Sequence, residues 1–214
     1  MANSGTEPLI FAVPKGRLLK LVAQRLARAG VPVEMFDESD RRLVRETRQP
    51  FPLRALLLKP DDVPTYVEYG AAHVGVVGRD VLLERGSEVF VPLDLELGRC
   101  RMVVAAPVGS MPDAVARRSR TLRVATKYPR IAAAHFAGRG DEVDVIYLGG
   151  SVEIAPQVGL ADWIVDLVET GETLQKNGLE VREIICEVSA VVIANRVAFK
   201  LRHSAMSELL RALA

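Results

Sequence analysis

Short apolar runs alternate with longer segments of helical periodicity along most of this 214-residue chain. The first run, LIFAVP (Leu9–Pro14), is apolar at every position, which is typical of a strand buried on both faces of a parallel sheet. The segment that follows, RLLKLVAQRLARAG, has apolar residues at helical spacing and predicts a helix that ends at Gly30. Repeated alternation of this kind predicts an α/β fold with mainly parallel sheets.

The same two patterns continue to the C-terminus. Strands are predicted at residues 53–60, 72–78, 100–108, 122–129, 143–150 and 162–168, with one or two more in 181–195. Helices are predicted at 61–70, 79–86, 131–138, 151–161, from 171 onward, and at 198–214. Asp62 and Asp80 stand where their side chains could cap two of these helices.

A proline- and arginine-rich stretch, PVGSMPDAVARRSR (Pro107–Arg120), predicts an exposed connector between two lobes. The long apolar segment at 181–195 could return the chain to the first lobe. We therefore predict a discontinuous lobe I of residues 1–103 and 187–214, and a lobe II of residues 104–186. A cleft between two such lobes is where open α/β sheets bind their ligands.

Composition excludes several classes of partner. The net charge is +1, so bulk electrostatics gives no reason to expect nucleic acid or an anionic membrane. Cys100, Cys186 and the three scattered histidines have no metal-ligand spacing, so no protein-bound metal is expected. The N-terminal MANSGTEP does not resemble a signal peptide, and no segment is apolar for long enough to span a bilayer. A cytosolic location is expected.

The stretch DLVETGETL stands where a predicted strand passes into a predicted helix. The start of a helix presents unpaired backbone N–H groups to an anion, and Gly171 permits close approach of the backbone. Thr170 and Thr173 add hydroxyl donors, while Asp166 and Glu169 can accept hydrogen bonds from sugar hydroxyls. The pattern suits a sugar phosphate, and an ordinary capped turn with a solvated acidic edge fits it as well.

Lys15 and Arg17 flank Gly16 at another strand-to-helix junction. Two cations there favour a polyanion such as a pyrophosphate, although a merely basic first turn is the alternative. Two further strand ends carry candidate groups: Tyr128 in ATKYP, and Glu153 in GGSVEIAP, where helix-dipole stabilisation alone would explain the acid. The histidines are not paired with a nucleophile in the sequence, so a hydrolytic triad is not expected.

Five stretches taken together are more specific than any one of them: PKGRL, DVPTYVEYGAAHVGVVGRDVL, ATKYP, GSVEIAPQVGLADWIVDLVETGETLQKNGL and VVIAN. With these stretches in this order, the sequence closely resembles the ATP phosphoribosyltransferases, which open histidine biosynthesis. The resemblance covers the chain from about Leu9 to about Arg211. The segment GLADWIVDLVETGETLQKNGL resembles the loop with which that family binds 5-phosphoribosyl 1-diphosphate (PRPP).

The resemblance implies a reaction in which N1 of the ATP adenine displaces pyrophosphate from C1 of PRPP, giving N1-(5-phosphoribosyl)-ATP. It also implies two lobes of the type II periplasmic-binding-protein kind and a substrate-bound Mg²⁺. The implied catalytic residues are Lys15, Arg17 and Arg41, and the implied ATP-binding residues are Lys59, Tyr128 and Glu153. The implied PRPP-binding residues are Asp166, Glu169, Thr170, Gly171, Glu172 and Thr173.

Two positions depart from the family pattern. His73 stands where the family often has aspartate, and we expect a structural role for it. DRRL is a loose match, so Arg41 and Arg42 are hard to distinguish.

The residues after Asn195 are too few for a further regulatory domain, and the chain therefore resembles the short form of the family. That form is expected as a homodimer that joins a regulatory subunit resembling histidyl-tRNA synthetase in a hetero-octamer. Two alternatives remain: a cytosolic two-lobe protein that binds a sugar phosphate or nucleotide without catalysis, and a non-catalytic subunit.

Overall fold

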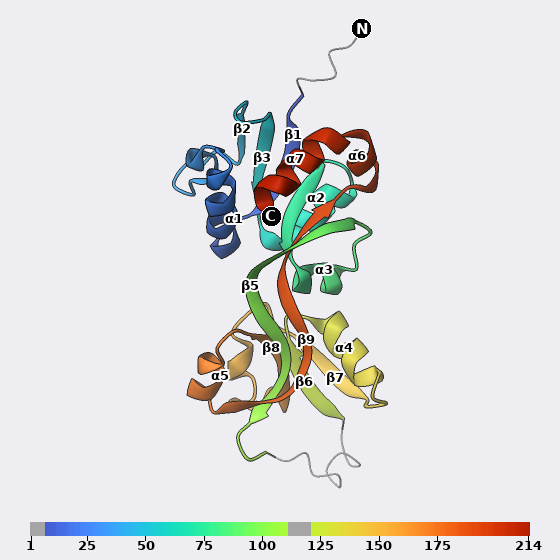
Figure 1. Ribbon diagram of the computed structural model, residues 1–214. Coiled ribbons are helices and arrows are strands. Elements are labelled where there is room, and N and C mark those ends of the chain that lie inside the picture. The colour runs from blue at the N-terminus through green and yellow to red at the C-terminus, as the bar shows by residue number, and fades with distance from the viewer. Residues whose placement is uncertain (1–6, 111–120) are drawn as a thin grey trace. The chain divides into compact units, whose positions relative to one another are not determined.

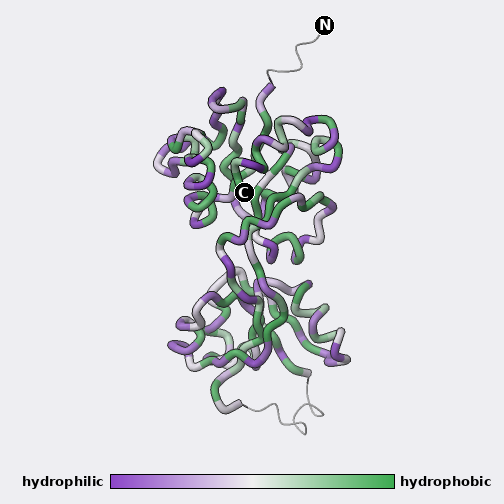
Figure 2. Tube along the Cα trace, viewed as in Figure 1, coloured by the Kyte–Doolittle hydropathy of each residue, from purple (hydrophilic) through white to green (hydrophobic). Residues whose placement is uncertain are grey.

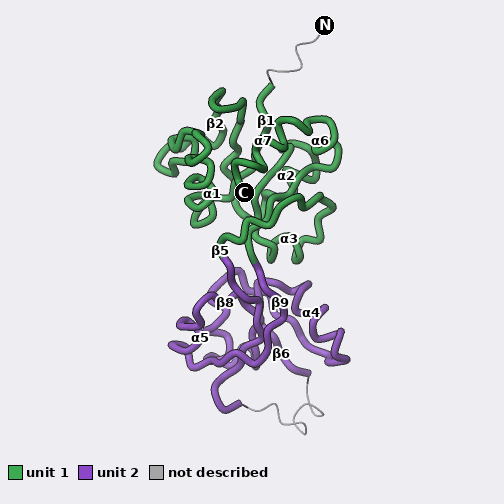
Figure 3. The backbone as a smooth tube through the Cα atoms, viewed as in Figure 1, with its two compact units in different colours: residues 1–98, 189–214 green, residues 99–188 purple. Residues whose placement is uncertain are grey.

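The computed structural model of the protein describes residues 7–110 and 121–214 (Figure 1). Most of the connector predicted at Pro107–Arg120, and most of the N-terminal tail, lie outside these residues. The chain forms two compact units, of which unit 1 contains residues 1–98 and 189–214 and unit 2 contains residues 99–188 (Figure 3). The chain passes between the units within two long strands, β5 (Phe90–Pro107) and β9 (Leu179–Ala194). The boundaries predicted from the sequence fall within the same two strands.

Unit 1 is built on strands β2, β3, β1, β4 and β9, in that spatial order. The strands β1 (Leu9–Pro14), β3 (Leu53–Leu58) and β4 (Val74–Gly78) run parallel, because β1 pairs with both of the others in parallel register. At the two sides of this group, β2 (Val44–Thr47) pairs antiparallel with β3, and β9 pairs antiparallel with β4. The strand β2 was not predicted.

Helices cover both faces of the unit 1 sheet. On one face, α1 (Arg17–Arg28), the 3₁₀ helix η1 (Val33–Phe36) and α7 (His203–Leu213) enclose a core with β1 and β3. On the other face, α2 (Val63–Glu68) and α3 (Arg79–Arg85) pack against β4 and β9. The remaining helical elements are η2 (Pro60–Asp62) and α6 (Arg196–Leu201).

The structure tests three local expectations for unit 1. The predicted terminal helix is two helices, α6 and α7, which meet at Arg202. Asp62 makes no side-chain cap hydrogen bond, because η2 leads directly into α2, and Gly78 rather than Asp80 occupies the N-cap of α3. His73 has the expected structural role: its Nδ1 accepts a 2.9 Å hydrogen bond from the backbone N–H of Ile10.

Unit 2 contains the strand order β9-β5-β8-β6-β7. The strands β6 (Leu122–Thr126), β7 (Val143–Tyr147) and β8 (Trp163–Val168) run parallel, whereas β5 is antiparallel to β8. The helix α4 (Pro129–Ala137) covers one face, and α5 (Glu172–Lys176) with η4 (Val152–Ile154) covers the other. Figure 2 shows that hydrophobic residues concentrate on the strands inside each unit.

For unit 2 the structure revises one prediction and decides between two alternatives in another. The helix expected at 151–161 is only the single turn η4 followed by further turns, because Pro156 and Gly159 interrupt the segment. The apolar segment at 181–195 is part of one continuous strand, β9. Parallel strand pairs in both units confirm the predicted α/β class.

Candidate functional site

A pocket of about 360 Å³ lies in unit 2 where β8 passes into α5. It gathers five of the six residues expected to bind PRPP, and Glu172 alone of that set is not in its lining. The lining residues are Glu153, Asp166, Leu167, Val168, Glu169, Thr170, Gly171, Thr173 and Leu174. Residues that the sequence places together are therefore assembled with Glu153, which comes from another element.

The turn at Gly171 is shaped to present backbone donors. Gly171 has a φ of 86°, in the left-handed region that a residue with a Cβ occupies only with strain. The backbone N–H groups of Thr170, Gly171 and Thr173 have no hydrogen-bond acceptor among the described residues. The helix α5 has only five residues, so its dipole adds little. Anion binding at this turn would therefore depend on the amides and on the threonine hydroxyls.

Asp166 has its carboxyl group inside this pocket. Burial raises the pKa of Asp166, and the charge of Glu153 raises it further, while a hydrogen bond from the backbone N–H of Leu167 and the charge of Lys127 oppose the increase. The bond from Leu167 to Asp166 Oδ1 measures 2.8 Å and fixes the orientation of the carboxyl group. A buried, oriented carboxylate is a suitable acceptor for ribose hydroxyls.

The carboxylates of this pocket do not form a metal cage. No group of three histidine, cysteine or acidic side chains that could hold a metal ion occurs in residues 7–110 and 121–214. Mg²⁺ prefers near-ideal octahedral geometry and is commonly held through substrate phosphates and water. The side chains of the pocket therefore suit a metal that enters with its substrate.

The basic junction predicted at Lys15 and Arg17 lies in unit 1, at the start of α1. Both side chains are exposed, and α1 has no acidic residue in its first turn. The backbone N–H of Gly16 donates a 2.8 Å hydrogen bond to Glu38 Oε1, so a carboxylate already lies at this helix start. A carboxylate of the chain itself thus accepts a hydrogen bond from a backbone N–H at the start of α1.

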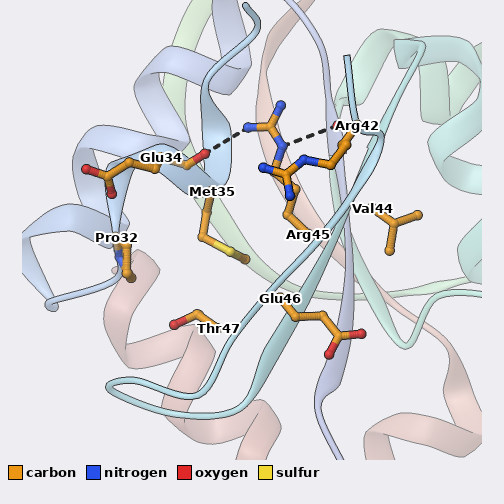
Figure 4. Close-up of a pocket in the computed structure, with 8 residues that line it drawn as sticks. All are labelled: Pro32, Glu34, Met35, Arg42, Val44, Arg45, Glu46 and Thr47. Atoms are coloured by element: carbon orange, nitrogen blue, oxygen red, sulfur yellow. Dashed lines mark hydrogen bonds between the residues drawn. The ribbon is translucent and has the colours of Figure 1, made fainter. Parts of the chain in front are cut away.

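Arg42, in the loop between η1 and β2, and Arg45, in β2, make different contacts (Figure 4). Arg42 forms an ion pair with Asp40 at 2.7 Å. Arg45 is buried and donates hydrogen bonds to four backbone carbonyls, those of Glu34, Asp37, Asp40 and Arg42. Arg45 therefore holds the loop in place. The sequence analysis missed this role because arginine side chains are mostly exposed.

Arg41 differs from both of these neighbours. It is exposed and has no hydrogen bond or ion pair with any residue that the structure describes. The two arginines that the sequence could not distinguish therefore differ in that only Arg42 is ion-paired with a described residue. A second pocket, of about 290 Å³, lies beside this loop and is lined by Pro32, Glu34, Met35, Arg42, Val44, Arg45, Glu46 and Thr47.

The three residues expected to bind ATP lie in different environments. Lys59 is exposed at the N-cap of η2 in unit 1. Glu153 lines the pocket of unit 2 with the phosphate loop. Tyr128 is 5% exposed and packs in the core under α4 with Phe136 and Trp163, so its ring offers no free face for adenine stacking.

Comparison with known proteins identifies the family. The family model described as HisG, ATP phosphoribosyltransferase, matches residues 59–214. A protein of Sorangium cellulosum named ATP phosphoribosyltransferase is 53% identical over 97% of this chain and 95% of its own length. The chain belongs to the ATP phosphoribosyltransferase family. A family member from Chromobacterium violaceum is 45% identical over 96% of this chain and 97% of its own length.

The comparison with solved structures supports the same family. The structure titled "ATP phosphoribosyl transferase (HisG:HisZ) complex from Thermotoga maritima" matches with a TM-score of 0.82 and 34% identity, covering 96% of this chain and 95% of that chain. The two-lobe α/β fold of the type II periplasmic-binding-protein kind is thereby confirmed. The enzyme class expected from the sequence is also confirmed, namely a phosphoribosyltransferase of the first step of histidine biosynthesis. None of the described helices is long and apolar enough to cross a membrane.

Proposed function

We propose that the pocket of unit 2 binds the phosphoribosyl part of PRPP while N1 of ATP displaces the pyrophosphate. The observation that carries this assignment is the convergence of Asp166, Glu153 and the turn at Thr170–Thr173 on one pocket. The amides and hydroxyls of the turn would hold the 5-phosphate. Asp166 and Glu169 would accept hydrogen bonds from the ribose hydroxyls and so orient C1 for in-line attack.

Displacement at C1 builds oxocarbenium character as pyrophosphate leaves. Stabilisation of charge and positioning of the two substrates therefore contribute most of the rate. The carboxylates of Asp166 and Glu153 would stabilise positive charge at the ribose. Lys15, Arg17 and Arg41 would neutralise negative charge on pyrophosphate or on the ATP phosphates, with Lys59 contributing to ATP binding. Glu172, which is exposed beside the pocket, would contribute only indirectly to PRPP binding.

Mg²⁺ would enter with the pyrophosphate group of PRPP. When bound there, the ion neutralises charge on the leaving group. The carboxylates of Glu153, Asp166 and Glu169, which line the pocket, could contact its water ligands.

We further propose that this chain works as the catalytic subunit of a larger assembly. The Thermotoga maritima structure, which matches over 96% of the chain, is titled as a HisG:HisZ complex. A regulatory subunit of that kind, a homodimeric catalytic core, a hetero-octameric assembly and a cytosolic location form the arrangement we expect. Histidine inhibition would then arise through an interface, as a coupling free energy between sites on different chains.

Release of pyrophosphate from ATP, PRPP and Mg²⁺ tests the activity. We expect weak or no turnover by the isolated chain, no response to histidine, and both activity and histidine inhibition after addition of the regulatory subunit. Inhibition of the isolated chain at histidine concentrations that inhibit the complex would contradict the proposed division of roles.

Calorimetric titration with PRPP tests the pocket itself. Thr173→Val removes one hydroxyl donor from the turn and is expected to weaken PRPP binding about tenfold or more, which is typical of a hydrogen bond to a charged group. Thr65→Val, on an exposed position of α2 in unit 1, is the matched control. Equal PRPP affinities of the two variants would exclude the pocket as the phosphoribosyl site.

A further inference from the structure

We propose that Arg101, on β5, and Lys127, directly after β6, bind phosphate oxygens of PRPP in the pocket of unit 2. This inference rests on the proposed function of that pocket and adds two residues to it. Neither residue lines the pocket directly, and neither belongs to the phosphate loop.

Strand register places both cations beside the carboxyl end of β8. On one side, β5 runs antiparallel to β8, with Arg101 opposite Val168 and Val103 opposite Asp166. On the other side, β6 runs parallel to β8 with Thr126 beside Val165, so the next residue, Lys127, comes beside Asp166. The strand that leads into the phosphate loop therefore has Arg101 on one neighbouring strand and Lys127 at the end of the other.

Arg101 also lies on the face of the sheet that carries the pocket. Val103, Ala105, Ala125, Ile164 and Val168 share one core cluster, on the side of η4 and α5. Since alternate residues of a strand point to the same face, Arg101 projects to that side from β5. Lys127 comes directly after β6, two residues after Ala125 of the same cluster, and its positive charge lowers the pKa of Asp166.

The charge of the pocket requires such groups. Its lining contains three carboxylates, those of Glu153, Asp166 and Glu169, and no lysine or arginine. A ligand with a phosphate and a pyrophosphate would meet net repulsion there, because like charges at close range disfavour binding. Cations at the neighbouring strand positions would reverse this balance within unit 2 itself.

The side chain of Arg101 is available to a ligand. It is half-buried, and its guanidinium has no hydrogen bond or ion pair with any residue in the described ranges. An arginine side chain packs its stem against the protein while its head group stays available for an anion. A planar guanidinium can donate two parallel hydrogen bonds to a phosphate. Lys127 is also half-buried, and its Nζ lies 6.0 Å from the centroid of the Tyr128 ring.

The test is calorimetric titration of the full chain with PRPP. We expect Arg101→Met and Lys127→Met each to weaken binding about tenfold or more, as for loss of a charge-assisted hydrogen bond. Lys127→Arg, which keeps the charge, is expected to remain close to wild type. Lys200→Met, at an exposed position of α6, makes the same charge change as Lys127→Met and is expected to bind PRPP as wild type does.

Thermal unfolding without ligand shows whether each variant folds, and Arg101→Gln replaces Arg101→Met if the latter unfolds. Wild-type PRPP affinity in folded Arg101 and Lys127 variants, with weakened binding in Thr173→Val, would overturn this inference and leave the proposed pocket intact. Wild-type affinity in Thr173→Val as well would overturn the pocket, and this inference with it.

Discussion

The carboxyl groups of Glu153 and Asp166 line one pocket although they come from different elements, η4 and β8. The charge of Glu153 adds to burial in raising the pKa of Asp166. An acid at this position is thus retained at a cost in stability, which is expected of a residue that serves a ligand.

This relationship predicts an unusual dependence of stability on pH. Because the folded state raises the pKa of Asp166 above 3.8, it holds a proton at pH values where the unfolded chain has lost it. The contribution of Asp166 to the free energy of unfolding therefore falls as pH rises from that value through the raised pKa. Asp166→Asn should unfold at a higher temperature than wild type at neutral pH, with the difference disappearing under acid conditions. The assignment would be contradicted if the unfolding temperature of wild type rose relative to that of Asp166→Asn as pH increases.

PRPP affinity should depend on the same proton in the opposite sense. The ionised form of Asp166 accepts hydrogen bonds from ribose hydroxyls, so binding should strengthen as pH rises through the raised pKa. Titrations of wild type and Asp166→Asn over a pH series measure this effect. The variant should bind PRPP weakly, and its affinity should vary less with pH than that of wild type.

A methyl group at Gly171 should affect both folding and binding. With a φ of 86°, an alanine there is strained by about 1–2 kcal/mol. Gly140 has a φ of 77° and lies at the end of α4, away from the pocket, so Gly140→Ala carries comparable strain. Denaturant unfolding should show similar losses for both variants, whereas only Gly171→Ala should lose PRPP affinity. Equal PRPP affinities would mean that the backbone at Gly171 does not approach the ligand.

Arg17 should matter for turnover more than for stability. If it stabilises charge in the transition state as an oxyanion-hole donor does, Arg17→Ala should lose on the order of 2–4 kcal/mol in kcat/KM. Arg28→Ala, an exposed arginine at the other end of α1, is the control and should keep normal rates. Steady-state kinetics of the assembled enzyme provide the measurement. Normal kcat and KM in a folded Arg17→Ala protein would remove this residue from the site.

Asn195 should be a strong determinant of the stability of unit 1. Its side-chain oxygen accepts hydrogen bonds from the backbone N–H groups of Val197 and Ala198 at 3.1 Å, and its amide donates to the carbonyls of Val67 and Glu68. Asn195→Ala removes the cap of α6 and the link to α2, and should lose about 2 kcal/mol of unfolding free energy. Asn195→Ser keeps a cap acceptor without placing a carboxylate against the two carbonyls, and should lose less. Urea unfolding compares the two variants.

Local sequence determined those parts of the protein that depend on neighbouring residues. Continuous apolar runs predicted β1, β3 and β8, because a strand buried on both faces has few polar positions. The polar turn after β8 was recognisable because Gly171, Thr170 and Thr173 are adjacent along the chain. The family resemblance rests on the same short, ordered stretches.

Tertiary structure decided what depends on distant partners. The strand β2 has no apolar run, and this segment becomes a strand because it pairs with β3. Tyr128 follows a strand end like a ligand-binding residue, yet core packing buries it. Strand register brings Arg101 and Lys127 to the two sides of β8, and folding brings Glu153 to Asp166. Register and packing are set by the whole hydrophobic core, so no local pattern encodes these proximities.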